Sequence, residues 1–205
     1  IRVLTIHNLC VILYSIIYSL YLKEKIFFVI YFPIYLCLYF LTEHLVASLS
    51  DVIWITDTAI DNLIPFWPGM VVFYCAWYPL LFFTGLYLLI NDSLSFRKFI
   101  TFMIIGFTSA QIFMLLVPNG QSLRPINYLS QIKPDIFTKL LEYLYIIDTP
   151  TNVFPSVHVI GSFMVMFAFI DNRKLRCLYK YSFVLTFLIS LSTLLFKILK
   201  LSFKY

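Results

Sequence analysis

Long runs of apolar residues, separated by short polar connections, dominate the pattern along this chain. Each run has about the length that a helix needs to cross the ~30 Å hydrocarbon core of a bilayer. Lipid offers no hydrogen-bond partner to an exposed peptide group, so a span of this kind must be helical or part of a closed barrel. The pattern therefore predicts an all-α membrane bundle of about six transmembrane helices, over residues 3–22, 26–42, 66–90, 99–117, 153–170 and 181–200.

The composition supports a membrane environment and argues against a soluble domain. Of the 205 residues, 61% are hydrophobic and only 12% are charged, whereas soluble domains carry about 25% charged residues. The net charge of +5 does not indicate a nucleic-acid partner, because the basic residues are scattered between apolar runs and form no stripe. The 4 cysteines lie singly in or beside apolar segments. They show neither a disulfide framework nor the spacing of a metal site.

The distribution of basic residues predicts an orientation. Lys and Arg occur in three alternate connections, 23–25, 91–98 and 171–180, whereas the connection 43–65 contains none and the connection 118–152 carries Arg124, Lys133 and Lys139. Connections on the cytoplasmic side of a membrane carry an excess of these residues. We therefore expect the three basic connections to face the cytoplasm. The connections 43–65 and 118–152 should then face outward.

A short amphipathic segment follows Pro134, over residues 135–147. Its apolar residues fall on one helical face, whereas its charged residues lie elsewhere on the surface. This pattern predicts a short helix lying on the membrane surface. The residues of the apolar face are Ile136, Leu140, Leu141 and Leu144.

Aromatic residues cluster around the start of the third apolar run. Such a cluster is typical of the aromatic belt at a membrane interface and is less often a ligand site. We therefore expect an interfacial belt formed by Trp54, Trp67, Tyr74, Trp77 and Tyr78.

The polar residues that can carry chemistry lie in the connection 118–152 and just after it. Residues 118–125 read PNGQSLRP, and residues 148–158 read DTPTNVFPSVH. Pro155 predicts a helix start, because proline is tolerated in a first helical turn. Ser156 and His158 would then lie beside free amides at the positive end of the helix dipole, which favours an anion. Arg124 can add charge and bidentate hydrogen bonds, so the pattern predicts a phosphate site.

The Arg-Pro pair at 124–125, followed by Pro-Ser-x-His at 155–158, resembles the superfamily of type 2 phosphatidic acid phosphatases and vanadium haloperoxidases. The likeness is closest to small bacterial membrane members related to the inositol phosphorylceramide synthase branch. The resemblance implies a phosphatase-type membrane domain over residues 26–205, truncated at its C-terminus. By the same resemblance, residues 1–25 are expected to form an extra span without a clear counterpart. The resemblance further implies an integral protein of the bacterial plasma membrane, with its site facing outward.

The resemblance also implies roles for single positions. His158 matches the histidine that protonates the leaving oxygen. In this family a histidine of the third motif attacks phosphorus and forms a phosphohistidine, and neither a metal nor another cofactor is required. The implied function is a lipid-phosphate phosphatase or phosphotransferase, with a lipid phosphate or diphosphate as its partner. By the same resemblance, the phosphate-binding residues are expected to be Arg124, Ser156, the backbone of Val157, Gln121 and Lys197.

This sequence departs from the family pattern at several positions. The lysine of the first motif falls on Val117, the nucleophilic histidine on Leu199, and the aspartate that orients it on Phe203. The likeness stops after Lys197, which suggests a truncation or a shifted reading frame. Because removal of a covalent nucleophile generally costs orders of magnitude in rate, the departure leaves open that the chain is inactive.

Two other classes of function stay open. The chain could be a membrane protein that binds a phospholipid without turnover, as the missing histidine suggests. It could also be a small transporter. Transporters usually place ionisable groups near the midplane of the bilayer, whereas the polar residues here gather at one membrane face, so this alternative ranks last.

Overall fold

The computed structural model describes residues 25–26, 29–46, 48, 54–56, 67–121 and 134–195, with residues 194 and 195 described by their backbone alone. The chain divides into two units, Ile1–Leu38 and Tyr39–Tyr205. The described residues of the first unit are helical, and the rings of Tyr31 and Tyr35 stack with their centroids 6.0 Å apart. The candidate functional residues belong to the second unit.

Within the described residues, three helices are long and apolar enough to cross a membrane: Val29–Val46, Pro68–Asn91 and Ser93–Leu116. The second comprises a 3-10 turn, η3 (Pro68–Met70), followed by α2 (Val71–Asn91), and the third is α3 (Ser93–Leu116). Two shorter helices follow, α6 (Val157–Asp171) and α7 (Tyr179–Leu195). The prediction of a mostly helical fold is thus confirmed, and three of its helices have the length and apolar composition that a membrane span needs. The predicted span 3–22 lies outside the described residues.

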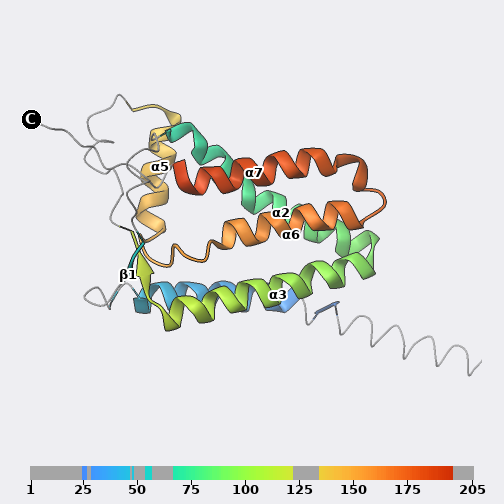
Figure 1. The fold of residues 1–205 in the computed structure, drawn as a ribbon, viewed down its shortest axis with the longest axis horizontal. Coiled ribbons are helices and arrows are strands. Elements are labelled where there is room, and N and C mark those ends of the chain that lie inside the picture. The colour runs from blue at the N-terminus through green and yellow to red at the C-terminus, as the bar shows by residue number, and fades with distance from the viewer. Residues whose placement is uncertain are drawn as a thin grey trace, which may run out of the picture. The chain divides into compact units, whose positions relative to one another are not determined.

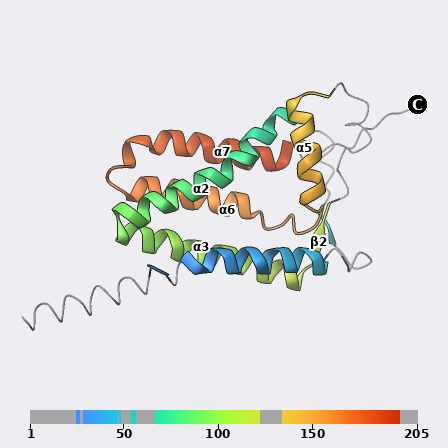
Figure 2. The same cartoon turned by 180° about the vertical axis from the view of Figure 1, so that it is seen from behind.

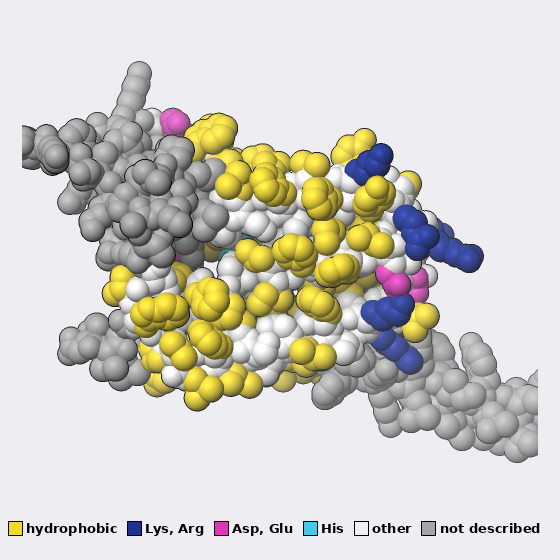
Figure 3. Space-filling view, in the orientation of Figure 1, with side chains coloured by type: hydrophobic (Ala, Val, Ile, Leu, Met, Phe, Trp, Pro, Cys, Tyr) yellow, Lys and Arg dark blue, Asp and Glu magenta, His cyan; other side chains and the backbone are white. Residues whose placement is uncertain are grey.

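Helices α2, α3, α6 and α7 pack along one another, and α6 contacts each of the other three (Figures 1 and 2). Their contact faces bury large side chains such as Phe107 and Ile189, whereas Phe83, Ile105 and Leu116 remain exposed. Apolar side chains spread over the face of these helices that Figure 3 shows. A wide apolar outer surface is typical of a protein whose solvent is hydrocarbon.

The connection between α2 and α3 is the single residue Asp92, so the predicted polar connection over residues 91–98 is wrong. The Asp92 carboxylate caps α3, because its Oδ1 atom accepts a hydrogen bond from the Ser95 amide at 3.1 Å. Arg97 and Lys98 therefore lie within the first two turns of α3, where they are exposed. Charged residues are common in loops, which is why the sequence predicted a connection here. They are also found in the first turns of a helix whose end is exposed to water.

Asp92 and its neighbours also tie α6 to the α2–α3 turn. The Asn172 side chain donates from Nδ2 to Asp92 Oδ2 at 2.8 Å, immediately after the end of α6. Lys98 Nζ forms an ion pair with Asp171 Oδ2 at 2.9 Å. A short 3-10 segment, η4 (Arg176–Leu178), then leads into α7. These polar contacts close one end of the bundle, and the Lys and Arg side chains visible in Figure 3 lie at this end.

The opposite end of the bundle contains a small sheet that the apolar pattern did not predict. β1 (Trp54–Ile55) pairs in parallel with β2 (Asn119–Gly120), and Gly120 forms an antiparallel bridge with Thr151. The sheet and its bridge bring the residues after α3 beside those before α6, although these segments are far apart in the sequence.

The predicted short helix is present as α5 (Ile136–Ile147), which lies across the sheet end of the bundle (Figure 1). The Asp135 side chain accepts from the Thr138 amide at 2.7 Å and completes a capping box. The apolar face of α5 packs on the start of α2, where a buried cluster forms, while Ile136 stays 75% exposed. The cluster consists of Val71, Tyr74 and Leu141, with Leu140 and Leu144 packed against it.

We predict that Asp92→Ala lowers the free energy of unfolding by about 0.5–2 kcal/mol, the usual cost of losing an N-cap. The hydrogen bond from the Ser95 backbone lowers the pKa of the Asp92 carboxyl. A lowered folded-state pKa means that this stabilisation is complete above about pH 4 and is lost as the pH falls through the folded-state pKa. Unfolding in detergent at two pH values, one near neutral and one well below the unfolded-state pKa, should show a deficit that shrinks at the lower pH.

The matched control is Asn91→Ala. Asn91 is exposed and makes a hydrogen bond to Tyr87 O within its own helix, so its loss should change stability by less than about 0.5 kcal/mol. An Asp92→Ala deficit of the same size at both pH values would contradict the role of the carboxylate.

Candidate functional site

Asn119 joins the two polar segments that the sequence places in one loop. Its side-chain nitrogen donates to Phe154 O at 2.8 Å and to Val117 O at 2.9 Å, and its side-chain oxygen accepts from the Phe154 amide at 2.9 Å. Its carbonyl oxygen also accepts from the Asn152 amide at 2.8 Å. Asn119 is fully buried, so these bonds satisfy polar groups that water cannot reach. The residues after α3 and those before α6 are therefore held side by side.

Ser156 is the N-cap of α6. Its hydroxyl accepts a hydrogen bond from the Val159 amide at 3.4 Å, and the helix begins at Val157. The expectation that Pro155 begins the helix is therefore wrong. The backbone amides of the first helical turn have no carbonyl acceptor within the helix. The Ser156 hydroxyl can accept from one of them, whereas proline has no side-chain acceptor, so Ser156 takes the N-cap position. Ser156 and Val157 keep the predicted position at the positive end of a helix dipole.

His158 is held by aromatic rings from one face of α2. Its imidazole stacks on Tyr74 with ring centroids 4.0 Å apart, lies 4.4 Å from the Trp77 ring, and meets the Tyr78 ring edge-on at 5.8 Å. The three rings are spaced three and four residues apart, which places them on the same face of a helix. With an exposed fraction of 8%, His158 is fixed by packing.

The aromatic contacts correct the expectation of an interfacial belt for two of its members. Tyr74 and Trp77 are only 3% and 6% exposed and face His158, whereas Trp54 and Trp67 are exposed as a belt residue would be. The spacing of Tyr74, Trp77 and Tyr78 along one helical face was the feature of the sequence that could have indicated inward-facing rings. Composition alone could not separate an inward stripe from an interfacial one.

A buried carboxylate, Glu43, supports the segment that precedes α6. Its Oε1 atom accepts from the Thr149 amide at 2.9 Å and from the Thr149 hydroxyl at 2.6 Å. The Thr149 and Thr151 hydroxyls are themselves 2.6 Å apart. Nearby in the sequence, Asp148 accepts from the Tyr74 hydroxyl at 3.3 Å, so the ring that stacks on His158 is tied to the same segment. Sequence reasoning missed Glu43 and Asn119 as supporting residues.

Side-chain amides at this end of the bundle have buried polar atoms without a partner among the described residues. They are both polar atoms of the Asn152 side chain and the side-chain nitrogen of Gln121. Asn152 also has a φ of 56°, in the left-handed region that asparagine tolerates better than most residues. Buried polar atoms are nearly always hydrogen-bonded in proteins. A polar ligand bound here could supply the missing hydrogen bonds of these side-chain amides.

Four of the predicted site residues fall within the described residues, on two segments that lie together. Ser156 caps α6, Val157 begins it, and His158 follows. The backbone N–H of Gln121 donates to Pro150 O at 2.9 Å, which places Gln121 beside the segment that leads into α6. The structure therefore places Gln121 beside the segment that leads to Ser156, Val157 and His158.

The remaining predicted residues fall elsewhere. Arg124 and Lys197 lie outside the described residues, as do Leu199 and Phe203. Among the residues that the structure describes, no group of three or more His, Cys, Asp or Glu side chains could hold a metal ion. What can be built from the described residues is a candidate anion site formed by a helix N-terminus, polar side chains and one packed imidazole.

Comparisons of the chain with protein-family models, with curated proteins and with solved structures find no match.

We predict that Asn119→Asp destabilises the protein by about 1–3 kcal/mol, because the carboxylate cannot donate to Phe154 O or Val117 O. Hydrogen exchange at the Phe154 amide should become faster, because losing the bond to Phe154 O loosens the loop, although a carboxylate oxygen can still accept from this amide. The control is Asn91→Asp, at an exposed position on α2, which should leave exchange at Phe154 unchanged. Unchanged stability and unchanged exchange in Asn119→Asp would show that Asn119 does not hold the loop.

We also predict that Gly161→Ala disturbs the packing of His158. An added Cβ would lie 2.7 Å from Trp77 Nε1 and 2.8 Å from Trp77 Cζ2, so the buried indole must move. Overpacking of this kind costs about 1–3 kcal/mol. The side-chain NMR signals of His158 should shift, because its ring contacts the same indole.

The control for this variant is Gly85→Ala. Both glycines lie within helices, so both variants share the gain in helix propensity. The added Cβ at Gly85 would meet a single Phe99 atom at 3.3 Å, which a small adjustment relieves. If the His158 signals shift in neither variant, the Trp77 indole does not transmit the added bulk at position 161 to the His158 ring.

Proposed function

We propose that this chain binds the phosphate group of a membrane lipid at the start of α6 and acts on it as a phosphatase or phosphotransferase. The observation that carries the proposal is the set of buried amide atoms of Asn152 and Gln121 in the segments that meet just before a helix N-terminus. Ser156, Val157 and Gln121 supply hydrogen-bond donors. A helix N-terminus and hydrogen-bond donors together favour a phosphate anion.

Positive charge comes from Arg124 and Lys197 in this proposal. Both assignments rest on the resemblance to the phosphatase superfamily, in which the arginine of the first motif binds phosphate. A guanidinium group can form two parallel hydrogen bonds to phosphate oxygens, so Arg124 would fix the orientation of the group as well as its charge.

His158 is the proposed proton donor. When the P–O bond to the leaving alcohol breaks, the leaving oxygen takes a proton from the imidazole. Because Leu199 occupies the place of the family nucleophile, water or an alcohol attacks phosphorus directly and returns a proton to the imidazole. Stacking against Tyr74 and Trp77 fixes the orientation of the ring, and orientation of this kind is a large part of acid–base catalysis.

The membrane arrangement forms part of the same proposal. We propose about six spans in the plasma membrane of a bacterium, with the site on the outer side. The support is the positive-inside rule, because the basic residues of the connection 171–180 follow the C-terminus of α6, whereas Ser156 lies at its N-terminus. A lipid phosphate at the membrane surface can meet the start of α6 while its chains stay in hydrocarbon.

A second candidate is phospholipid binding without turnover. It is favoured by Leu199 and Phe203, which stand where the resembling family has its nucleophilic histidine and its aspartate. The two candidates share the phosphate site and differ only in whether a nucleophile reaches phosphorus.

We predict that the purified protein releases phosphate from a short-chain phosphatidic acid or a prenyl diphosphate in detergent with EDTA present. His158→Ala should lower the rate about 100-fold or more, the usual contribution of a general acid. His44→Ala is the matched control, because His44 is an exposed histidine on another helix.

Binding of the same lipid separates the two candidates. Binding that Arg124→Ala weakens, without phosphate release, supports the second candidate. A wild-type protein that neither binds the lipid phosphate nor releases phosphate contradicts both.

A further inference from the structure

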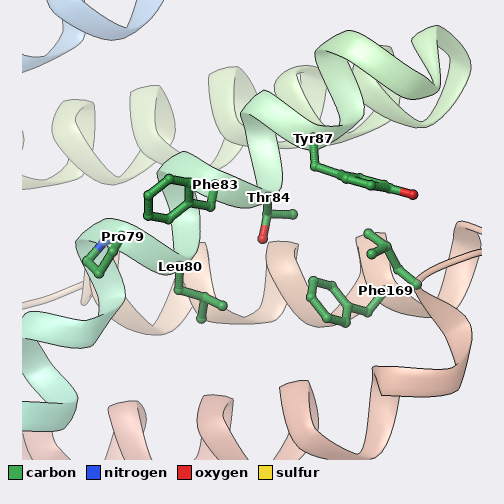
Figure 4. A pocket seen from close by; sticks show the side chains of 7 residues that line it. Pro79, Leu80, Phe83, Thr84, Tyr87 and Phe169 are labelled. Atoms are coloured by element: carbon green, nitrogen blue, oxygen red, sulfur yellow. The ribbon is translucent and has the colours of Figure 1, made fainter.

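A groove lies between α2 and the C-terminal end of α6, away from the phosphate site. It has a volume of about 410 Å³ and is lined by residues of α2 together with Phe169 and Leu175. Figure 4 shows Pro79 toward one end and Tyr87 and Phe169 toward the other. Apart from the hydroxyl groups of Thr84 and Tyr87, the lining is apolar. Its size lies within the range of about 300–1,000 Å³ that is usual for ligand sites.

The end of the groove at Leu175 is strongly basic. Leu175 stands between Lys174 and Arg176, and residues 171–180 contain four basic side chains but only one acidic side chain, Asp171. Lys98 already pairs with Asp171 at 2.9 Å. Within the described part of the chain, Lys174 and Arg176 are exposed and form no ion pair, although Arg176 Nε donates to a backbone carbonyl at 2.9 Å. An apolar groove therefore ends in an excess of positive charge.

We propose that this groove holds one acyl chain of an anionic phospholipid, whose headgroup phosphate lies against Lys174 and Arg176. The charge selects the headgroup, and the apolar lining selects the chain. Basic pockets between membrane helices bind anionic headgroups in this way. The lipid is distinct from the proposed substrate, because Phe169 follows His158 by 11 residues along α6, or about 16 Å at about 1.5 Å per residue.

The test compares binding of phosphatidylglycerol and phosphatidylcholine with identical acyl chains to the purified protein by native mass spectrometry. One phosphatidylglycerol should be retained in preference to phosphatidylcholine. The double variant Lys174→Gln and Arg176→Gln should weaken phosphatidylglycerol binding by about 5-fold for each charge removed. Lys139→Gln, at an exposed position on α5, is the charge control and should leave binding unchanged.

The groove itself is tested by Leu80→Trp, which fills it, with Phe82→Trp as its control. Phe82 is exposed on the same helix but does not line the groove. Leu80→Trp should reduce binding of both lipids, whereas Phe82→Trp should not. Glycerol 3-phosphate, which carries a phosphate but no acyl chain, should not compete.

Several outcomes would overturn the proposal. They are equal retention of both lipids by the wild type, full phosphatidylglycerol binding in the double charge variant, and competition by glycerol 3-phosphate. The charge variants alter exposed residues, so their outcome does not depend on whether Leu80→Trp folds.

Discussion

The candidate site depends on the hydrogen bonds of one buried asparagine. Asn119 follows α3, and its side chain bonds to both backbone groups of Phe154, just before α6 begins. Without these bonds, the fully buried side chain of Asn119 would lack hydrogen-bond partners, which is costly where water is excluded. Because these bonds form, the residues around Gln121 lie against the segment that leads to Ser156, although the two are distant in the sequence.

The two proposed sites lie at opposite ends of α6 and therefore at opposite ends of its helix dipole. Its N-terminus, at Ser156 and Val157, presents the positive end of the helix dipole to the proposed lipid phosphate. Its C-terminus is followed by the basic residues at the end of the groove, where positive side chains complement the negative end of the dipole. The apolar length between them packs on α2, α3 and α7. One short helix therefore separates the two proposed anion sites.

Most of the described helices could be predicted from the sequence, but less of the site could be. Apolar runs predict helices because the pattern is local, and the start of α6 near Ser156 follows from local chemistry. The supporting roles of Asn119 and Glu43 could not be found in this way, because their partners Phe154 and Thr149 are 35 and 106 residues away. Such contacts depend on tertiary packing, which periodicity does not report.

Solid-state NMR of the protein with ¹⁵N-labelled histidine and a bound, non-hydrolysable lipid phosphonate tests the proposed phosphate site. Dipolar recoupling between ³¹P and ¹⁵N reports whether the phosphorus lies beside an imidazole. A phosphate bound at the start of α6 should dephase the His158 signal, identified by its loss in His158→Asn, and should leave the His44 signal unchanged. No dephasing of the His158 signal, with the phosphonate demonstrably bound, would contradict a phosphate site at the start of α6.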